Sequence, residues 1–391
     1  MKRRLLNFFV IATFLSLFFS SCKNNTFWVD ESIETAAYQL DMMAKEISGK
    51  EKLPRSIRDG EIRLEDLYDW TSGFFPGSLW YMYEFTKDEM FKKQAVEYTD
   101  LLYNLKDYAG THDLGFMVYC SYGNGFRLTG DTSYIHVMVE TSDNLISRFN
   151  EKTGTIRSWD FGEWQFPVII DNMMNLELLF WASDFTKNTV YRDVALRHAD
   201  TTMKNHYRPD FSSYHVIDYD TITGNVIAKQ TFQGYADESA WARGQAWGLY
   251  GYTVCYRATG DEKYLRMAEN IAGFIMDNVK TEDLIPYWDY NAPDIPNAPR
   301  DASAAAVTAS ALFELSQYTK QGDKYFNYAE TVLKNLSGEQ YLAKKGENKG
   351  FILMHSVGHL PANSEIDTPL NYADYYYLES LMRYKNLISK K

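Results

Sequence analysis

The chain has 391 residues, enough for one large domain or two smaller ones. Hydrophobic residues make up 45% and charged residues 24%, which excludes a mainly disordered or fibrous protein. An excess of 52 acidic over 40 basic residues gives a net charge of −12 and argues against a nucleic-acid partner, which would need a basic surface. Aromatic residues reach 16%, so the chain can build a large core and still line a groove with rings.

The N-terminus has the order of an export signal. Residues 2–4 are basic, and residues 5–19 form a mostly apolar stretch that is too short to cross a membrane. Ser20 and Ser21 then precede Cys22. This order resembles a bacterial lipoprotein signal, with cleavage before Cys22 and a lipid on its sulfur; a secretory signal with a chance cysteine is the alternative. We expect a periplasmic protein that meets the membrane through this lipid alone.

The expected cleavage before Cys22 sets the domain boundaries. We expect a signal peptide over 1–21, a tether over 22–31 and a single domain over 32–391. Two cysteines remain, Cys120 and Cys255, and both lie in apolar helical stretches. We expect two buried free thiols rather than the disulfide that an exported protein could form.

A faint repeat organises the domain. Five segments begin with a threonine, pass through a short turn containing Lys, Gly, Asp or Asn, and then reach an aromatic residue. Each turn lies between two helical patterns, where Gly or Asn can end the first helix and Asp or Asn can cap the second. Each turn is therefore expected at the tip of a helical hairpin. The threonines are Thr86, Thr129, Thr186, Thr259 and Thr319.

The helices before these turns are mainly apolar on all sides, whereas those after them are amphipathic. The first set is predicted at 74–86, 115–129, 171–185, 239–258 and 302–318. The second set is predicted at 88–107, 131–148, 188–206, 261–279 and 323–336. Two further helices, at 32–47 and 371–387, would complete six hairpins. Six buried helices inside six amphipathic ones predict an all-α (α/α)6 barrel; the uneven repeat disfavours the alternative, an open solenoid.

The loops between hairpins are long, and they should gather at the rim where the inner helices begin. Loops of this length in a compact domain are usually functional. Asp113 and Asp171 lie at this rim beside His112 and Asn172, with no lysine or arginine close in sequence. Two carboxyl groups in an aromatic pocket are typical of sugar chemistry, in which one holds a proton and the other stays ionised.

Other side chains at the rim suggest a ligand. Arg243 lies in an otherwise apolar helix and needs an anionic partner, either a ligand carboxylate or an internal salt bridge. Trp70, in a loop, is a candidate for stacking on a sugar. Trp241 and Trp247 point to different sides of their helix, so one of them is expected in the core. His215 lies in a long loop, either as a surface residue or at the site.

A metal site is not indicated. His355 and His359 have the i, i+4 spacing of a metal pair, but no third ligand is evident near them. We therefore expect no metal and no cofactor.

Four segments at the rim carry a family resemblance. They are His112-Asp113-Leu114-Gly115-Phe116, Asp171-Asn172-Met173-Met174-Asn175, Ser213-Tyr214-His215 and Trp241-Ala242-Arg243-Gly244-Gln245-Ala246-Trp247. With them the chain resembles the unsaturated glucuronyl hydrolases of glycoside hydrolase family 88, over about residues 30–388. The last segment is quite specific to that family and the second fairly so. The family's fold is an (α/α)6 barrel, which the helix pattern predicts independently.

The resemblance implies a reaction. These enzymes hydrate the C4=C5 double bond of the 4,5-unsaturated uronic acid that polysaccharide lyases leave at a non-reducing end, as in glycosaminoglycan disaccharides, and so release it. By position, Asp171 resembles the general acid and base, and Asp113 its partner carboxylate on the ring hydroxyls. Arg243 and His215 would hold the uronate end. The positions expected to line the substrate site are Trp70, His112, His215, Gln233, Arg243 and Trp247.

Two alternatives stay open. The related unsaturated rhamnogalacturonyl hydrolases, which act on pectin fragments, share the barrel and a similar acid, although the His112-Asp113 pair favours the glucuronyl branch. A non-catalytic glycan-binding lipoprotein is a different class, in which Asp113 and Asp171 need not meet. The expected partner in each case is an oligosaccharide, and we expect a monomer.

Overall fold

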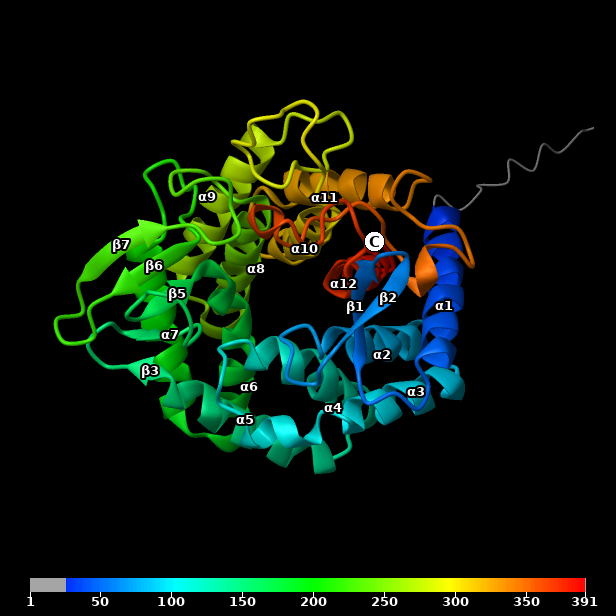
Figure 1. Ribbon diagram of the computed structural model, residues 1–391, viewed down its shortest axis with the longest axis horizontal. Helices are drawn as coiled ribbons and strands as arrows, with labels where there is room; N and C mark the ends of the chain where they lie inside the picture. Colours follow the sequence, from blue (N-terminus) through cyan, green and yellow to red (C-terminus); the bar gives the residue numbers. More distant parts are fainter. Residues whose placement is uncertain (1–25, 391) are drawn as a thin grey trace, which may run out of the picture.

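The structure is a computed structural model that describes residues 26–390. The predicted signal peptide and Cys22 lie outside these residues. Figure 1 shows one ring of helices inside another, with the long loops and short strands gathered on the face turned toward the viewer. Inner helices contact one another in a closed order, from α2 through η2, α6, α8, α10 and α12 back to α2. The predicted (α/α)6 barrel is therefore confirmed.

The elements follow the predicted hairpins. The inner helices are α2 (Phe74–Thr86), the π-helix η2 (Gly115–Gly123) with α4 (Asn124–Thr129), the 3₁₀-helix η3 (Ile170–Asn175) with α6 (Leu176–Thr186), α8 (Ala242–Thr259), α10 (Ala302–Leu315) and α12 (Asn371–Ile388). The outer helices are α1 (Phe27–Glu46), α3 (Glu89–Asp100), α5 (Ser133–Ser147), α7 (Thr189–Asn205), α9 (Glu262–Asn278) and α11 (Gly322–Leu336). Short 3₁₀-helices lie at η1 (Tyr103–Asp107), η4 (Asn348–Gly350) and η5 (Leu360–Ala362).

The repeated threonines hold the short turns together. The Thr86 hydroxyl donates to the Met82 carbonyl at 2.7 Å and accepts the backbone N–H of Asp88 at 3.2 Å. Lys87, between them, adopts the left-handed conformation that ends a helix. One hydroxyl group thus forms hydrogen bonds with a carbonyl in the last turn of the inner helix and with a backbone N–H of the turn that follows. The same two contacts recur at Thr129, Thr186 and Thr259.

The first helix corrects the expected tether. α1 begins at Phe27 rather than at residue 32, so most of the described part of the 22–31 segment is helical. Val29 is buried, and the Trp28 ring lies 5.3 Å from the Tyr384 ring of α12. These apolar contacts anchor the segment to the barrel.

The long loops carry short strands that the helical periodicity did not predict. They pair as three antiparallel sheets, β1 with β2, β3 with β4, and β5 with β6 and β7. Each strand has six residues or fewer, too short for an alternating pattern to stand out. The strands are β1 (Leu53–Arg58), β2 (Glu61–Glu65), β3 (Phe149–Asn150), β4 (Thr155–Ile156), β5 (Pro167–Ile169), β6 (Val216–Tyr219) and β7 (Val226–Gln230).

The two remaining cysteines are free and buried, as predicted. Cys120 lies in η2 and Cys255 in α8, both on inner helices. Burial raises the pKa of both thiols, which keeps them protonated.

Glycines let the inner helices pack closely. A Cβ atom added at Gly251 of α8 would lie 2.5 Å from the Cβ and 3.0 Å from the carbonyl oxygen of Met173. Gly273, on the outer helix α9, has no such neighbour within 4 Å. Only the first glycine is therefore needed for packing.

Gly251→Ala is expected to lower the free energy of unfolding by about 1–3 kcal/mol, because an overpacked core must shift. Gly273→Ala is the matched control and should leave stability unchanged or raise it by up to about 1 kcal/mol, since alanine is the better helix former. Urea unfolding of both variants and the parent measures the difference. Equal stability of the two variants would contradict the packing argument.

Candidate active site

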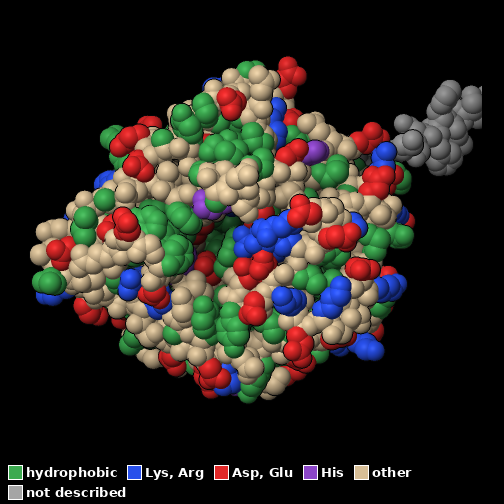
Figure 2. Space-filling model, viewed as in Figure 1, with side chains coloured by type: hydrophobic (Ala, Val, Ile, Leu, Met, Phe, Trp, Pro, Cys, Tyr) green, Lys and Arg blue, Asp and Glu red, His purple; other side chains and the backbone are tan. Residues whose placement is uncertain are grey.

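The two carboxylates predicted at the rim lie on neighbouring inner helices. Asp113 comes two residues before η2, and Asp171 lies in the first turn of η3. The two helix starts are joined by a hydrogen bond from the Phe116 backbone N–H to Asn175 Oδ1 at 2.9 Å. A Cβ atom added at Gly115 would lie 2.6 Å from the Asn175 Cα, so this close approach requires glycine. Figure 2 shows this face hollowed near its centre, with charged side chains and a histidine around the opening.

The Asp113 carboxylate is held by its two neighbours in the chain, Thr111 and His112. Its Oδ2 accepts a hydrogen bond from the Thr111 hydroxyl at 2.8 Å, and its Oδ1 lies 3.3 Å from His112 Nε2. Burial raises the pKa of Asp113, His112 and Thr111 oppose that rise, and the charges of Asp171 and Asp69 add to it. The charge of Asp171 therefore helps the Asp113 carboxyl group to hold a proton.

His112 is buried beside the same pair. Burial lowers the pKa of its imidazole, although the charges of Asp113 and Asp171 act in the opposite direction. Its backbone N–H donates to the Ser158 carbonyl at 3.1 Å, which fixes the position of the loop. His112 is thus brought to the site as predicted, as a neutral neighbour of Asp113.

Asp171 faces His215. The shortest approach is 3.5 Å, from His215 Nε2 to Asp171 Oδ2. His215 Nδ1 accepts the backbone N–H groups of Phe232 and Gln233, each at 3.0 Å. Because Nδ1 accepts twice, a neutral His215 must carry its proton on Nε2, which faces the carboxylate. The local backbone therefore selects the tautomer that can donate to Asp171.

The small sheet explains why these two residues meet. β5 leads directly into η3, and β6 follows His215. The register pairs Ile169 with Val216, and the Ile170 N–H donates to the His215 carbonyl at 3.1 Å. A one-residue slip of this register would turn His215 away from Asp171.

Trp70 and Gln233 also lie at the site. The Trp70 ring is partly exposed and packs 4.9 Å from the Tyr372 ring and 5.6 Å from the Phe116 ring. Gln233 donates its side-chain N–H to the Gly358 carbonyl at 3.1 Å, while its backbone N–H holds His215. Gln233 thus joins the last loop to His215.

Trp247 packs beneath the rim, and its indole Nε1 has no hydrogen-bond partner within residues 26–390. Its side chain is fully buried in the core, with its ring 5.2 Å from that of Phe116 and 5.5 Å from that of Tyr376. Its partner in the motif, Trp241, is the one at the rim, with its ring 4.7 Å from the His215 imidazole. Which tryptophan faced the core depended on how α8 is rotated.

Arg243 makes the internal salt bridge that the sequence offered as the alternative to a ligand carboxylate, and the ligand contact stays a prediction. Its Nη1 lies 3.1 Å from Asp301 Oδ2 and also contacts the Val357 carbonyl, and its Nη2 donates to the Gly358 carbonyl at 2.7 Å. Its residue is 1% exposed, and its guanidinium lies 4.4 Å from the Trp241 ring. Its charge is thus neutralised within the framework of the rim.

The two histidines of the last loop have separate partners. His355 Nδ1 lies 2.6 Å from Asp367 Oδ1, and His359 Nε2 lies 2.7 Å from the Phe232 carbonyl oxygen. Among residues 26–390, no group of three His, Cys, Asp or Glu side chains is arranged to hold a metal ion.

An aromatic cluster beside His215 was missed from the sequence. The Trp159 and Phe161 rings stack at 5.0 Å, and Phe232 lies 5.4 Å from Trp159 and 4.7 Å from His359. Phe161 is 55% exposed. The density of rings in the 159–166 segment was the available signal. Such a platform suits the apolar face of a sugar.

Tyr372 is a second residue that the sequence analysis missed. It opens α12 and is fully buried, and its hydroxyl has no hydrogen-bond partner in the described part of the chain. Asp171 Oδ2 and His215 Nε2 also lack hydrogen bonds there. Unpaired buried polar atoms are costly, so these are the atoms that a bound ligand would satisfy.

Comparison with known proteins agrees with this geometry. Residues 41–379 match the family described as "Glycosyl Hydrolase Family 88", and residues 1–64 match a domain of unknown function. An unsaturated glucuronyl hydrolase of Formosa agariphila is 51% identical over 326 residues, 82% of this chain and 81% of that protein.

Solved structures are similar over nearly the whole chain. A crystal structure of an unsaturated glucuronyl hydrolase specific for heparin is 54% identical, with a TM-score of 0.91 over 93% of this chain and 98% of that one. A variant of the Streptococcus agalactiae unsaturated glucuronyl hydrolase, in complex with dGlcA-GalNAc6S, is 30% identical, with a TM-score of 0.80 over 92% of each chain.

Arg243→Lys is expected to lower the free energy of unfolding by about 1–3 kcal/mol, because one ammonium group cannot replace the contacts of the fork with Asp301 and two carbonyls. Arg300→Lys is the matched control. Arg300 pairs with Asp283 at 2.8 Å in a partly exposed position, so the loss there should be below about 1 kcal/mol. Thermal and urea unfolding measure both. Parental stability of Arg243→Lys, combined with a raised KM alone, would instead support a direct ligand contact.

Proposed function

Because the chain belongs to glycoside hydrolase family 88, we propose that its rim site hydrolyses lyase-generated oligosaccharides and releases 4,5-unsaturated uronic acid from their non-reducing ends. The observation that carries this is the close approach of the two helices that hold Asp113 and Asp171, with the Nε2 of His215 facing Asp171. This arrangement disfavours the binding-only alternative, in which the two carboxylates need not lie on neighbouring elements.

Asp171 is the general acid and base of the proposed reaction. Its carboxyl group protonates C4 of the C4=C5 double bond, and the resulting carboxylate takes a proton from the water that adds at C5. The product is a hemiketal, which opens its ring and releases the neighbouring sugar. His215 Nε2 lies 3.5 Å from Asp171 Oδ2, and a small approach during the reaction would let its N–H donate to the carboxylate that forms after proton transfer.

Asp113 positions the sugar in this scheme. A carboxylate that already accepts the Thr111 hydroxyl retains acceptor capacity for ring hydroxyls. Trp70 and the aromatic cluster around Trp159 offer apolar faces on two sides of the pair. The rim therefore provides polar contacts for the hydroxyl edges of a sugar and apolar contacts for its faces.

The substrate class that we propose is glycosaminoglycan-type disaccharides. The support comes from relatives: one is named as specific for heparin, and another has been solved with dGlcA-GalNAc6S. Pectin-derived fragments remain the comparison substrate, since unsaturated rhamnogalacturonyl hydrolases share the barrel. A panel of unsaturated disaccharides from hyaluronan, chondroitin, heparin and pectin tests this: fastest turnover of the pectin fragment would contradict the proposed class.

Asp171→Asn is nearly isosteric but can neither donate the proton nor activate water. The rate of turnover is expected to fall by about 10²–10⁴-fold, the usual share of general acid–base catalysis, while folding and substrate binding persist. Asp184→Asn, on the exposed far end of α6, is the control and should keep parental turnover. Steady-state kinetics and a binding measurement separate the two effects. Near-normal turnover of Asp171→Asn would show that Asp171 is not the general acid and base.

The position of water attack distinguishes hydration from ordinary glycoside hydrolysis. Hydration destroys the conjugated alkene, so its ultraviolet absorbance should decay as product forms. In ¹⁸O-labelled water, the label should enter C5 of the uronic product. Mass spectrometry or ¹³C NMR of the product locates it, and label at the anomeric carbon would exclude this mechanism.

We further propose that the mature protein is a periplasmic, monomeric lipoprotein anchored through Cys22. The support is the order of basic residues, apolar stretch and Ser-Ser-Cys at the start of the chain. Within residues 26–390, no helix is both long and apolar enough to cross a bilayer. α1, which begins at Phe27, would place the barrel only a few residues from the lipid.

Cys22→Ser is expected to move the protein from the membrane fraction to the soluble fraction of its host, because the lipid can no longer be attached. Cys120→Ser, which alters a buried thiol of the barrel, is the control and should stay with the membrane. Fractionation followed by immunoblotting measures both. A parental protein that is already soluble in its host would refute the anchor.

A further inference from the structure

α1 begins at the end of the barrel opposite the catalytic rim, which we call the far mouth. The Trp28 ring packs 5.3 Å from the Tyr384 ring, and Asp30 Oδ1 lies 3.9 Å from Lys385 Nζ. Both partners lie in the last two turns of α12, a helix that starts at the rim. The segment that joins the proposed lipid site to the barrel therefore enters at the far mouth.

The proposed anchor leaves little chain between the lipid and this mouth. From Cys22 to Thr26 the chain takes four steps of at most about 3.6 Å, so it spans no more than about 15 Å. α1, with 20 residues, then runs about 30 Å toward the rim, where Gln39 donates to the Phe351 carbonyl of the last loop at 2.8 Å. A lipid on Cys22 is thus held near the far mouth, and the rim is out of its reach.

Two hairpin tips at the far mouth expose apolar side chains. Both tips have the order Phe-Thr-Lys followed by a capping Asp or Asn, at residues 85–88 and 185–188. Met90 is 38% exposed beside the first tip, and Phe185 and Val190 are 45% and 48% exposed at the second. The same short sequence thus places apolar groups in solvent at two separate tips.

The start of α1 extends this apolar surface. Phe27, its first residue, is 67% exposed. At the far end of the arc, the Phe185 ring stacks on the Trp181 ring at 5.3 Å. In the described part of the chain, the tips at Thr259 and Thr319 have no exposed large hydrophobic side chain. The apolar side chains are therefore confined to the arc of the mouth that runs from α1 through α2 to α6.

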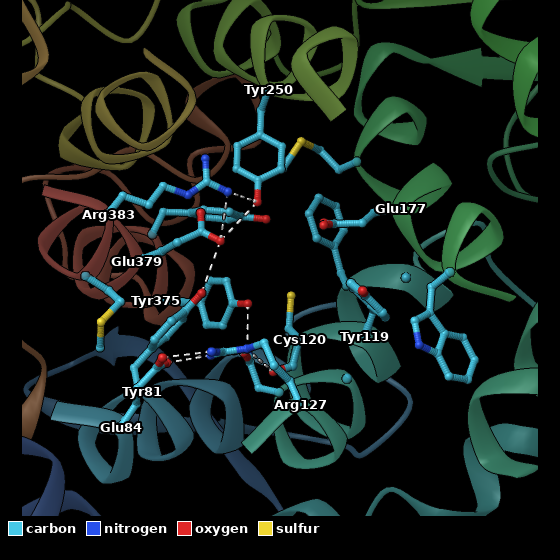
Figure 3. Close-up of a pocket in the computed structure, with 18 of the residues that line it drawn as sticks. Tyr81, Glu84, Tyr119, Cys120, Arg127, Glu177, Tyr250, Tyr375, Glu379 and Arg383 are labelled. Atoms are coloured by element: carbon cyan, nitrogen blue, oxygen red, sulfur yellow. Dashed lines mark hydrogen bonds and ion pairs between the residues drawn. The ribbon is translucent and has the colours of Figure 1, made fainter. Parts of the chain in front are cut away.

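The centre of the far mouth is polar but electrically balanced. A cavity of 450 Å³ lies there, and its walls include the last turns of α2, α4 and α8 (Figure 3). The charged side chains that line it form three ion pairs, Glu84 with Arg127, Glu177 with Arg257, and Glu379 with Arg383. Because these side chains carry no net charge together, the exposed apolar groups around the cavity determine which kind of surface the mouth favours.

We propose that this apolar arc rests on the bilayer that holds the lipid anchor, with Phe27, Phe185 and Val190 among the lipid headgroups and the catalytic rim turned away. The inference rests on the proposed anchor at Cys22. Apolar side chains gain free energy when they leave water for the boundary between headgroups and acyl chains. Side chains on separate tips suit a fluid lipid surface better than a protein partner, which needs a continuous, closely fitted interface. This orientation leaves the catalytic hollow open to oligosaccharides in solution.

Two matched labels test the orientation. Phe185→Cys at the far mouth and Phe161→Cys beside the rim replace phenylalanines of similar exposure, while Cys120 and Cys255 are buried. Each full-length, lipid-modified variant is labelled with a thiol-reactive dye and placed in phosphatidylcholine vesicles containing spin-labelled lipid, which quenches fluorescence only at short range. The label at position 185 should lose emission, and the label at position 161 should keep it.

A third label tests whether the apolar side chains hold the contact. A dye on Met90→Cys reports on the other hairpin tip. Changing Phe185 and Val190 together to serine should reduce its quenching, because the arc then loses two of its apolar groups. The same change at Ile222 and Ile227, which are exposed on the β6–β7 hairpin, is the matched control and should leave the quenching as it was.

Mass spectrometry of the parent shows separately whether Cys22 carries a lipid. With the lipid present and the protein recovered with the vesicles, quenching of both matched labels, of neither, or of the Phe161→Cys label alone overturns the orientation while the anchor stands. Equal quenching at Met90→Cys in the two double-serine variants overturns the role of the apolar side chains. A parent without lipid overturns the anchor and this inference with it.

Discussion

One buried cation holds the catalytic rim together. Arg243 projects from α8 to the start of α10, where Asp301 neutralises it and the Ser303 hydroxyl accepts from it. It also donates to two carbonyls of the last loop, those of Val357 and Gly358. Gly358 in that loop also accepts from Gln233, whose backbone N–H is one of the two that bind His215 Nδ1. A guanidinium can serve three partners in fixed directions, which an ammonium group cannot. The orientation of His215, which faces Asp171, therefore depends on the ion pair between Arg243 and Asp301.

The two ends of the barrel differ in their connections: the turns at one end repeat, and the loops at the other end do not. At one end, the short turns share one set of hydrogen bonds. The hydroxyl of a threonine, such as Thr86 or Thr259, bonds to the last turn of one helix and to the residue that leads into the next helix. At the other end, each connection differs, and small sheets give the loops a register. The hairpins thus provide a constant frame, and the pairing of β5 with β6 sets the alignment that brings His215 to Asp171.

Local signals predicted the helices well, and long-range contacts explain what they missed. α2 begins and ends at the predicted residues, because apolar patterning and turn chemistry act within a few positions. The partner of Arg243 lies 58 residues away at Asp301, and no local pattern could choose it over a ligand. Similarly, the choice between Trp241 and Trp247 depends on the rotation of α8 against its neighbours. The short strands and the unpaired Tyr372 hydroxyl likewise arise only once the loops are packed.

The inner helices run parallel to one another, so their helix dipoles point the same way along the barrel. Every inner helix begins at the catalytic rim, so the partial positive charges of six N-termini converge where Asp113 and Asp171 lie. The matching negative ends converge at the other mouth, and there the last turns of α4 and α8 carry Arg127 and Arg257. Carboxylates at the rim and guanidinium groups at the far mouth are what this field favours. Glu84 and Glu314 lie in the last turns of α2 and α10 and are carboxylates placed against this field. Each is paired with arginine there, Glu84 with Arg127 and Glu314 with Arg257 and Arg383, so the ion pairs compensate for the unfavourable position of the two carboxylates.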